Sequence, residues 1–225
     1  MSLDYRNCIR LASKYLPKNA VAIDVGCNIN PIVEMNCADW IENWNDDFTF
    51  LFLEKMNQST CIGIDLLHWQ TYEQRWQNDQ RVKLLKYGLS DKDDSEFIFL
   101  PGHRHVLSSF YLQDCFKDDD VEIKKIPCKK LDTLALELSL NKIDYLKVDT
   151  EGAEYKILCG AKDLLEQKKI TFIQFEYGLI GDNIPSVNLI CNLLSEYEYK
   201  QILVSGREQL WVEKNTYTKH IKTIE

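Results

Sequence analysis

Acidic residues end several of the apolar segments in this chain. Each of these segments reads as a buried strand, and the residues at their ends are Asp24, Asp65, Ser90 with Asp91, Asp149 and Glu176. Ligands of open α/β sheets bind beyond the carboxyl ends of the strands. Crowded carboxylates cost free energy unless they serve a cationic or hydroxyl-rich ligand. The pattern therefore predicts an acidic rim that binds such a ligand.

The first of these segments continues into the turn of residues 22–30, AIDVGCNIN. This turn lacks the G-x-G-x-x-G pattern, and the Lys-Ser/Thr pair of a P-loop is also missing, which argues against a pyrophosphate site. Asp65 stands where Rossmann-like folds bind ribose hydroxyls, and Gly26 allows a close approach of the backbone. S-adenosylmethionine combines a ribose, a sulfonium and an ammonium that suits the acidic loop at Asp24. We therefore expect it as the cofactor.

A second group of residues suits proton removal from an acceptor. Asp149 ends a central strand and Glu176 ends the next, so the two carboxylates can share one hydroxyl or one metal ion such as Mg²⁺. Lys147 lies on the same side of its strand as Asp149. It either forms a structural ion pair or positions the carboxylate or the substrate, and the sequence favours neither. His105, in the loop PGHRHVLSSF, is the alternative base.

The elements that position these residues follow from the hydrophobic pattern. Nearly continuous apolar runs predict strands at 21–25, 61–65, 83–90, 96–100, 143–149 and 170–176. Helical periodicity predicts helices at about 4–16, within an N-terminal segment 1–18, and also at 153–164 and 186–197. YKQILVSG and EQLWVEK, joined at Gly206, predict a closing antiparallel hairpin. The fold class is α/β, with a mostly parallel sheet covered by helices on both faces.

Composition limits the classes of function. The 225 residues suit a single domain, and a net charge of −8 argues against a nucleic-acid partner. No apolar run is long enough to span a membrane, and the first residues lack the apolar stretch of a signal peptide. The eight cysteines form no C-x-x-C pair, which predicts free thiols and a cytoplasmic location.

Five stretches resemble the FkbM family of S-adenosylmethionine-dependent methyltransferases. They are AIDVGCNIN, YGLSD, LSSF, IPCKKLDTL and IDYLKVDTEGAEYKILCGAKDLL, and with the strand that ends at Glu176 they span about residues 20–178. The resemblance implies a class I methyltransferase fold, Rossmann-like and seven-stranded. It also implies methylation of hydroxyl groups on sugars or natural products.

The chemistry of the residues and the resemblance together predict three sets of site residues. Those expected to bind the cofactor are Asp24, Gly26, Cys27, Asn28, Asp65, Leu66, Gly88, Leu89 and Ser90. Those expected to contact the acceptor are Glu151, Ser108 and Ser109. The catalytic group remains Asp149, Glu176, Lys147 and His105, with Asp149 and Glu176 as the ligands of any metal ion.

Two features depart from the family pattern. Asn30 stands where family members commonly have glycine, and residues 36–57 resemble an insertion that forms either a lid or an oligomer contact. The function expected is O-methylation of a sugar or glycan hydroxyl. The alternatives are O-methylation of a lipid, polyketide or peptide hydroxyl, and a catalytically silent binding module of the same fold.

Overall fold

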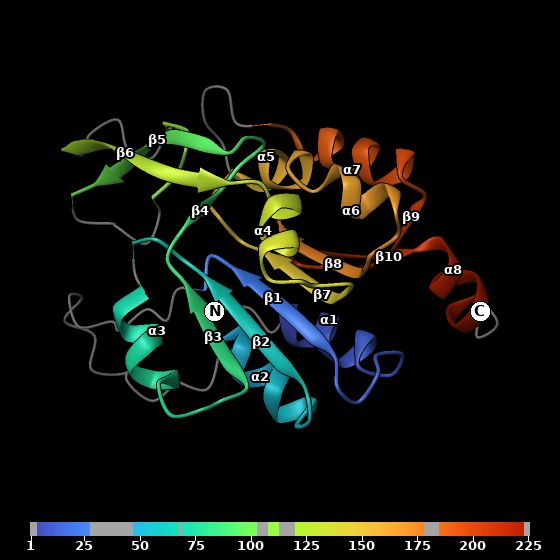
Figure 1. Ribbon diagram of the computed structural model, residues 1–225. Coiled ribbons are helices and arrows are strands. Elements are labelled where there is room, and N and C mark those ends of the chain that lie inside the picture. Colours follow the sequence, from blue (N-terminus) through green and yellow to red (C-terminus); the bar gives the residue numbers. More distant parts are fainter. Residues whose placement is uncertain are drawn as a thin grey trace.

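The computed structural model describes residues 4–27, 47–67, 69–102, 108–112, 120–177 and 185–222 (Figure 1). Asn28, Asn30 and His105 lie outside these ranges, as does the first half of the segment predicted to be an insertion. Among the described helices, none is both long and apolar enough to cross a membrane.

The described strands include a seven-stranded sheet that confirms the predicted fold class. Its order is β3 (Val82–Leu85), β2 (Thr60–Ile64), β1 (Val21–Val25), β7 (Ile143–Val148), β8 (Ile170–Glu176), β10 (Glu208–Glu213) and β9 (Tyr199–Ser205). The first five strands run parallel, and β10 is antiparallel to both of its neighbours. The predicted closing hairpin is therefore confirmed. This is the arrangement of a class I methyltransferase, in which the order reverses between β1 and β7.

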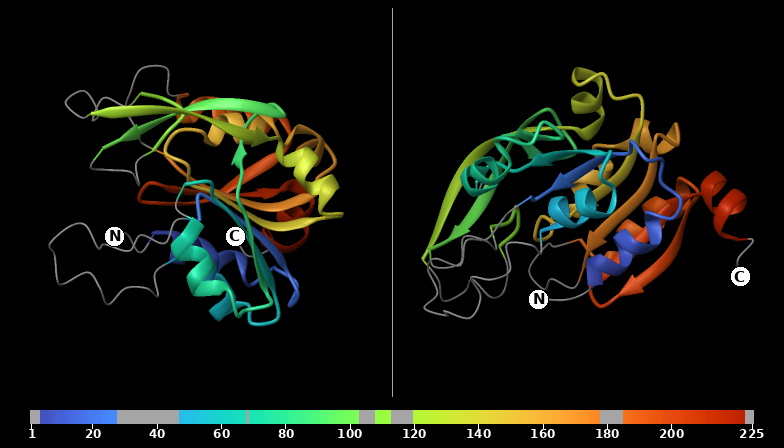
Figure 2. Two further views of the ribbon diagram at one scale, coloured as in Figure 1. Left: turned by 60° about the vertical axis from the view of Figure 1, so that its left-hand side comes forward. Right: turned by 90° about the horizontal axis from the view of Figure 1, so that it is seen from below.

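Helices cover both faces of this sheet (Figures 1 and 2). One face packs against α4 (Leu131–Glu137), α5 (Glu154–Cys159), α6 (Lys162–Glu166) and α7 (Val187–Glu196). The other packs against α1 (Asp4–Ala12), α2 (Phe48–Lys55) and the C-terminal segment of α8 (Lys214–Thr216) and η5 (Tyr217–Ile221). The remaining helix, α3 (Trp69–Trp76), connects β2 to β3.

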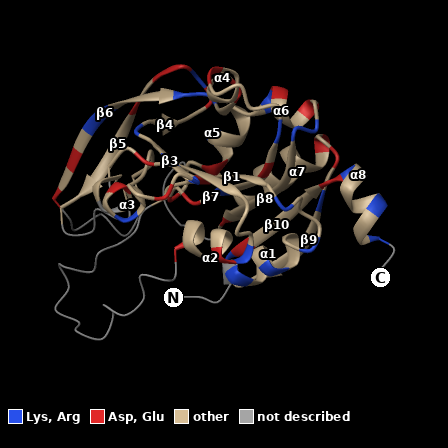
Figure 3. Ribbon diagram, turned by 60° about the horizontal axis from the view of Figure 1, so that its bottom comes forward, with Lys and Arg blue, Asp and Glu red and all other residues tan. Residues whose placement is uncertain are grey.

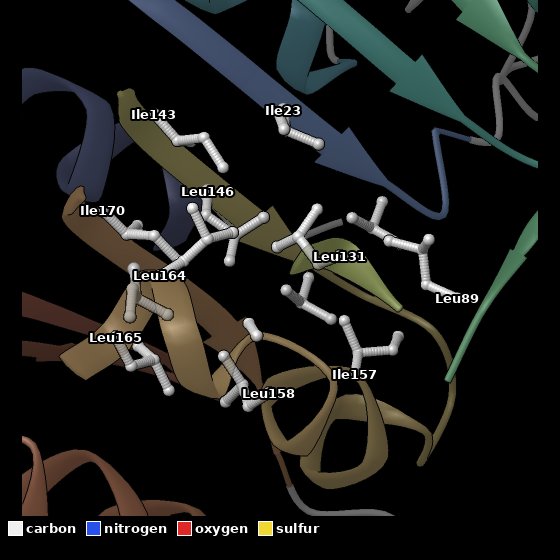
Figure 4. Close-up of a cluster of buried hydrophobic side chains, with 14 of the residues drawn as sticks. Ile23, Leu89, Leu131, Ile143, Leu146, Ile157, Leu158, Leu164, Leu165 and Ile170 are labelled. Atoms are coloured by element: carbon white, nitrogen blue, oxygen red, sulfur yellow. The ribbon is translucent and has the colours of Figure 1, made fainter. Parts of the chain in front are cut away.

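Alternating side chains of each strand supply the two cores. On β1, Ile23 belongs to the core beneath α4–α7 and Ala22 to the core beneath α1 and α2. Figure 4 shows Ile23 and Leu146 of the sheet facing Leu131 of α4 and Ile157 of α5. Both faces of the sheet are thus buried, which accounts for the nearly continuous apolar runs in the sequence.

A second, three-stranded sheet was not predicted. It consists of β4 (Gly88–Leu89), β6 (Val121–Lys129) and β5 (Asp94–Pro101), and it lies beside the main sheet (Figure 2). The single strand predicted at 83–90 is wrong, because the chain leaves the main sheet after Leu85 and pairs with β6 from Gly88 onward. The strand predicted at 96–100 exists but belongs to this second sheet. Strand β6 contains Pro127 and four charged residues, which obscure its pattern.

The helix predicted across 153–164 is two short helices, α5 and α6. Gly160, between them, packs against strand-end backbone, since a Cβ there would lie 2.1 Å from the carbonyl oxygen of Ser90. The Asp132 carboxylate then starts α6 by accepting hydrogen bonds from the backbone N–H groups of Asp163 and Leu164, both at 3.0 Å. The contact of Gly160 with Ser90 and the cap by Asp132 therefore divide one amphipathic pattern into two helices.

The described half of the segment 36–57 belongs to the core. Helix α2 places Phe48, Phe52 and Leu53 against the sheet, each at most 3% exposed. Asp47 caps the helix by accepting a hydrogen bond from the N–H of Phe50 at 2.7 Å. Residues 48–55 therefore form the helix that follows β1 and covers the sheet, and this part of the segment is not a lid.

Candidate active site

The carboxyl ends of β1, β2, β7 and β8 meet along one edge of the main sheet. Beyond the strands, the Asp149 N–H donates to the Val25 carbonyl at 3.1 Å, and the Gly26 N–H donates to the Ile64 carbonyl at 2.9 Å. Figure 3 shows acidic segments near the ends of β1 and β7. The structure thus brings Asp65, Asp149 and Glu176 to one edge, as the sequence predicts. Ser90 and Asp91 follow β4, which pairs with β6 of the second sheet and not with a strand of the main sheet.

Asp24 does not lie on the rim where it was predicted. It stands inside β1, and its side chain is only 2% exposed. The Thr49 hydroxyl of α2 donates a hydrogen bond to Asp24 Oδ2 at 2.9 Å, and Lys147 Nζ lies 3.2 Å from Oδ1. Oδ2 therefore accepts a hydrogen bond from within the protein, and Oδ1 forms an ion pair with Lys147.

Lys147 links this buried carboxylate to the edge of the sheet. Its Nζ is 3.4 Å from Asp149 Oδ2 as well as 3.2 Å from Asp24 Oδ1. Burial lowers the pKa of Lys147, but attraction to Asp24, Asp149 and Glu208 more than reverses that effect and holds it well above its usual range. The ammonium is charged, and the two interpretations of Lys147 are not exclusive: it forms a buried ion pair and also contacts Asp149.

Three carboxylates gather above Lys147. Asp149, Glu151 and Glu176 each offer an oxygen within 4.8 Å of the others. Burial raises the pKa of Glu176 to about 8, with further contributions from the charge and hydrogen bond of Asp149, while Arg207 acts in the opposite direction. Burial, followed by the charges of Asp149 and Glu154, raises the pKa of Glu151 to about 7. The cluster therefore retains protons at neutral pH, as expected for carboxyl groups that share a site.

The turn after β7 aims Glu151 into this cluster. Glu151 has a φ of 56°, a left-handed conformation that costs a non-glycine residue about 1–2 kcal/mol. Glu154 holds the turn: its Oε1 accepts hydrogen bonds from the N–H groups of Thr150 and Gly152 at 2.8 and 3.2 Å. Glu154 is therefore a structural residue of this turn.

Two residues at the β9–β10 turn complete the cluster, and sequence analysis missed both. The Arg207 guanidinium forms an ion pair with Glu176, and Glu208 lies opposite Glu176 in the strand register. Glu208 accepts a hydrogen bond from Gln174 at 2.8 Å. The predicted hairpin could have indicated both residues. Its turn lies next to the strand that ends at Glu176, so residues of the turn lie near that acid.

A comparison with known protein families shows which family this chain belongs to. The Methyltransferase FkbM domain matches residues 24–200, which covers most of the chain. The chain belongs to the FkbM family of methyltransferases. A comparison with curated proteins found no significant match. The family resemblance found in the motifs is thus confirmed, and with it S-adenosylmethionine as the implied methyl donor.

The first loop of this FkbM domain explains the glycine at position 26. Gly26 has a φ of 74°, and a Cβ there would lie 1.9 Å from the carbonyl oxygen of Asp149. The glycine is thus required by the contact between β1 and the turn after β7, in addition to any approach of a ligand. Gly26, which was predicted to bind the cofactor, is therefore in direct contact with the turn that carries the acids.

Asp65 has the position and chemistry of a ribose-binding acid. It follows β2 at the shared edge and is half-buried, and its Oδ1 accepts a hydrogen bond from the Leu67 N–H at 2.7 Å. That bond fixes the carboxylate at the strand end, where a ribose would lie. Leu66 packs near the second sheet, and Cys27 is buried against Tyr72. The described residues on this side therefore fit S-adenosylmethionine.

The remaining described site residues differ in their burial. Gly88 packs against Cys128, Leu89 is in the main core, and Ser90 is fully buried with its hydroxyl donating to Glu96 at 2.9 Å. Ser109 is 1% exposed, and its hydroxyl donates to the Glu151 carbonyl at 2.5 Å. Ser109 thus supports the acidic turn, and Ser108 is the more accessible of the two predicted serines.

Proposed function

We propose that this protein is an O-methyltransferase that modifies a hydroxyl group of a sugar or glycan. The observation that carries the proposal is the cluster of Asp149, Glu151 and Glu176, whose oxygens lie within 4.8 Å of one another at the cofactor edge. Carboxylates accept hydrogen bonds from several hydroxyls at once, which suits a polyol. The net charge of −8 disfavours phosphorylated and nucleic-acid acceptors.

In this proposal the carboxylates remove the proton of the acceptor hydroxyl. Bound S-adenosylmethionine supplies a methyl group on a sulfonium centre that an oxygen nucleophile can attack. A sugar hydroxyl is a poor nucleophile at neutral pH, so a base must take its proton during transfer. Asp149 is that base, Glu176 shares its proton network, and Lys147 holds Asp149 from below at 3.4 Å. Glu151 and Ser108 orient the acceptor.

The same carboxylates also offer a site for a divalent cation. Three oxygen donors in this geometry suit Mg²⁺, and Asp149 and Glu176 are the ligands we propose. An ion there would lower the pKa of a bound hydroxyl and so assist its deprotonation. We also propose a cytoplasmic location, supported by free thiols at Cys8, Cys27, Cys61, Cys128, Cys159 and Cys191.

The test is methyl transfer from tritiated S-adenosylmethionine to a glycan array, run beside lipid, polyketide, peptide and RNA acceptors. Incorporation into neutral glycans that is lost in Asp149→Asn is expected. Incorporation only into one of the other acceptors would replace the sugar assignment by that class. Cofactor binding without transfer to any acceptor would favour the silent binding module.

A second set of variants separates the candidate bases. Asp149→Asn should lower turnover about 10²–10⁴-fold while cofactor affinity, measured by calorimetry, stays within about twofold. Glu176→Gln and His105→Ala are compared in parallel, with and without a chelator. Loss of activity in His105→Ala alone would move the base to the loop. Inactivation by chelator, reversed by Mg²⁺, would establish the acids as metal ligands.

A further inference from the structure

A chain of buried polar side chains runs from helices α2 and α3 to the acidic cluster. The Tyr72 hydroxyl lies 2.9 Å from Thr49 Oγ1, which donates to Asp24 Oδ2 at 2.9 Å. Asp24 Oδ1 then faces Lys147 Nζ at 3.2 Å, and Lys147 faces Asp149 at 3.4 Å. Tyr72, Thr49 and Asp24 are at most 1% exposed. This series of polar side chains therefore connects α2 and α3 to the proposed base Asp149 through the interior of the protein.

The Thr49 hydroxyl sets the direction of this chain. Thr49 donates its single hydroxyl proton to Asp24 Oδ2. Tyr72 is then the donor to Thr49. With Oδ2 of Asp24 held by Thr49, Oδ1 is left to face the ammonium of Lys147. One hydroxyl on α2 thus orients a carboxylate that in turn holds the lysine beneath Asp149.

We propose that Thr49 is a positioning residue for methyl transfer, acting through Asp24 and Lys147 on Asp149. If Thr49 lacks its hydroxyl, the buried Oδ2 of Asp24 loses its hydrogen-bond donor, which is unfavourable. The ion pair of Asp24 and Lys147 then shifts so that Oδ2 regains a donor. Lys147 can move with Asp24, because its flexible side chain places the ammonium between Asp24 and Asp149. The proposal rests on the proposed role of Asp149, and it gives α2 a function within the segment 36–57.

The direct test is structural and needs no acceptor. Crystal structures of Thr49→Val, which keeps the side-chain shape, and Thr49→Ser, which keeps the hydroxyl, are compared with the wild-type protein. We expect the contact between Lys147 and Asp149 to be lost in Thr49→Val and kept in Thr49→Ser. An unchanged contact in Thr49→Val overturns the proposal. If Thr49→Val does not fold, Thr49→Cys replaces it with the same expectation, because a thiol is a poor donor.

Kinetics then separate positioning from general stability. On the acceptor found by the array, at a temperature where all variants are folded, Thr49→Val should lower kcat about 10–100-fold, as expected for a misplaced catalytic group. Its Kd for S-adenosylmethionine should stay within about twofold, and Thr49→Ser should retain most of the activity. Wild-type kcat in Thr49→Val overturns the proposal, whereas wild-type kcat in Asp149→Asn refutes the proposed base instead.

A double-mutant cycle with Lys147→Gln completes the test. If Thr49 acts through Lys147, adding Thr49→Val to Lys147→Gln should cause little further loss of kcat. An equal loss in both backgrounds would show that Thr49 acts independently of Lys147 and would overturn the proposal.

Discussion

Glu154 and Asp65 show how single side chains shape the two halves of the candidate active site. Glu154 accepts backbone hydrogen bonds of the turn 150–152 and so supports the left-handed conformation of Glu151. Asp65 caps the Leu67 N–H at the end of β2. Glu154 thus positions a member of the acidic cluster, whereas the proposed ribose ligand Asp65 is itself held in place by a backbone hydrogen bond.

Removing Asp65 should weaken cofactor binding. Hydrogen bonds to a charged group contribute roughly 1.5–3 kcal/mol, so Asp65→Ala should raise the Kd for S-adenosylmethionine about 10–150-fold. Calorimetry measures this directly, with Asp79→Ala, outside the proposed site on the turn before β3, as the control. Unchanged affinity in a folded Asp65→Ala protein would remove this residue from the site.

The raised pKa of Glu176 predicts a pH-dependent stability. Its pKa of about 8 in the folded protein exceeds the ordinary value of 4.5, so folding favours the protonated form. In the metal-free protein, this group's contribution to stability is therefore present below pH 4.5 and is lost as pH rises toward 8.

Glu176→Gln should remove the loss of folding stability that accompanies the rise in pH toward 8. Relative to the wild-type protein, we expect the variant to gain on the order of 2 kcal/mol at pH 8.5 and little at pH 4.5. Denaturant unfolding with chelator present measures both values, and Glu166→Gln, at an exposed position on α6, is the control. Parallel pH profiles for Glu176→Gln and the wild-type protein would contradict the prediction.

At the level of elements, contacts between distant segments decide where helices begin and end. Helix α6 starts at the carboxylate of Asp132, which lies on α4, and Gly160 before it packs on the end of β4. The acidic turn, α5 and the second sheet are joined in the same way, through Ser109 and through the ion pair of Lys156 with Glu96 at 2.8 Å. The second sheet is therefore fastened to the active-site turn.

Loss of the cap should destabilise this arrangement. Asp132→Ala removes both hydrogen bonds to the start of α6 and should lower the free energy of unfolding by about 1–2 kcal/mol. Asp163→Ala, an exposed acid in the first turn of the same helix, should change it by less than about 0.5 kcal/mol. Equal unfolding midpoints in denaturant for the two variants would show that the cap is not what stabilises α6.

At the level of the whole molecule, we expect the net charge to influence which acceptors bind. The protein carries 35 acidic and 27 basic residues, and its proposed site adds three clustered carboxylates to this excess. A negative protein repels anionic ligands over a distance that salt shortens. Neutral and anionic sugars should therefore respond differently to ionic strength.

A matched pair of acceptors tests this effect. For a neutral oligosaccharide, KM should change little between about 20 and 300 mM salt, whereas for its uronic-acid analogue KM should fall severalfold as screening weakens the repulsion. Steady-state kinetics on both acceptors provide the measurement. A KM for the acidic analogue that rises with salt would instead reveal a cationic binding surface and contradict the prediction.

The sequence by itself determined most strands of the main sheet and the positions of several candidate site residues. Strands β1, β2, β7 and β8 are continuous apolar runs because both faces of the sheet are buried, so burial left a local pattern that could be read directly. The positions of Asp149 and Glu176 at the ends of two such strands followed from it. Motif resemblance added the family, which the domain match confirmed.

Only the tertiary structure decided which acids reach the edge and what holds them. Asp24 looks like a strand-end acid in the sequence, but strand register places it opposite Lys147, and Thr49 comes to it from a helix 25 residues away. Arg207 reaches Glu176 across a hairpin turn, and β6 pairs with β5 and β4 in a separate sheet. These contacts join residues far apart in the chain, and hydrophobic periodicity carries no signal for them because it reports burial but not the identity of the neighbour.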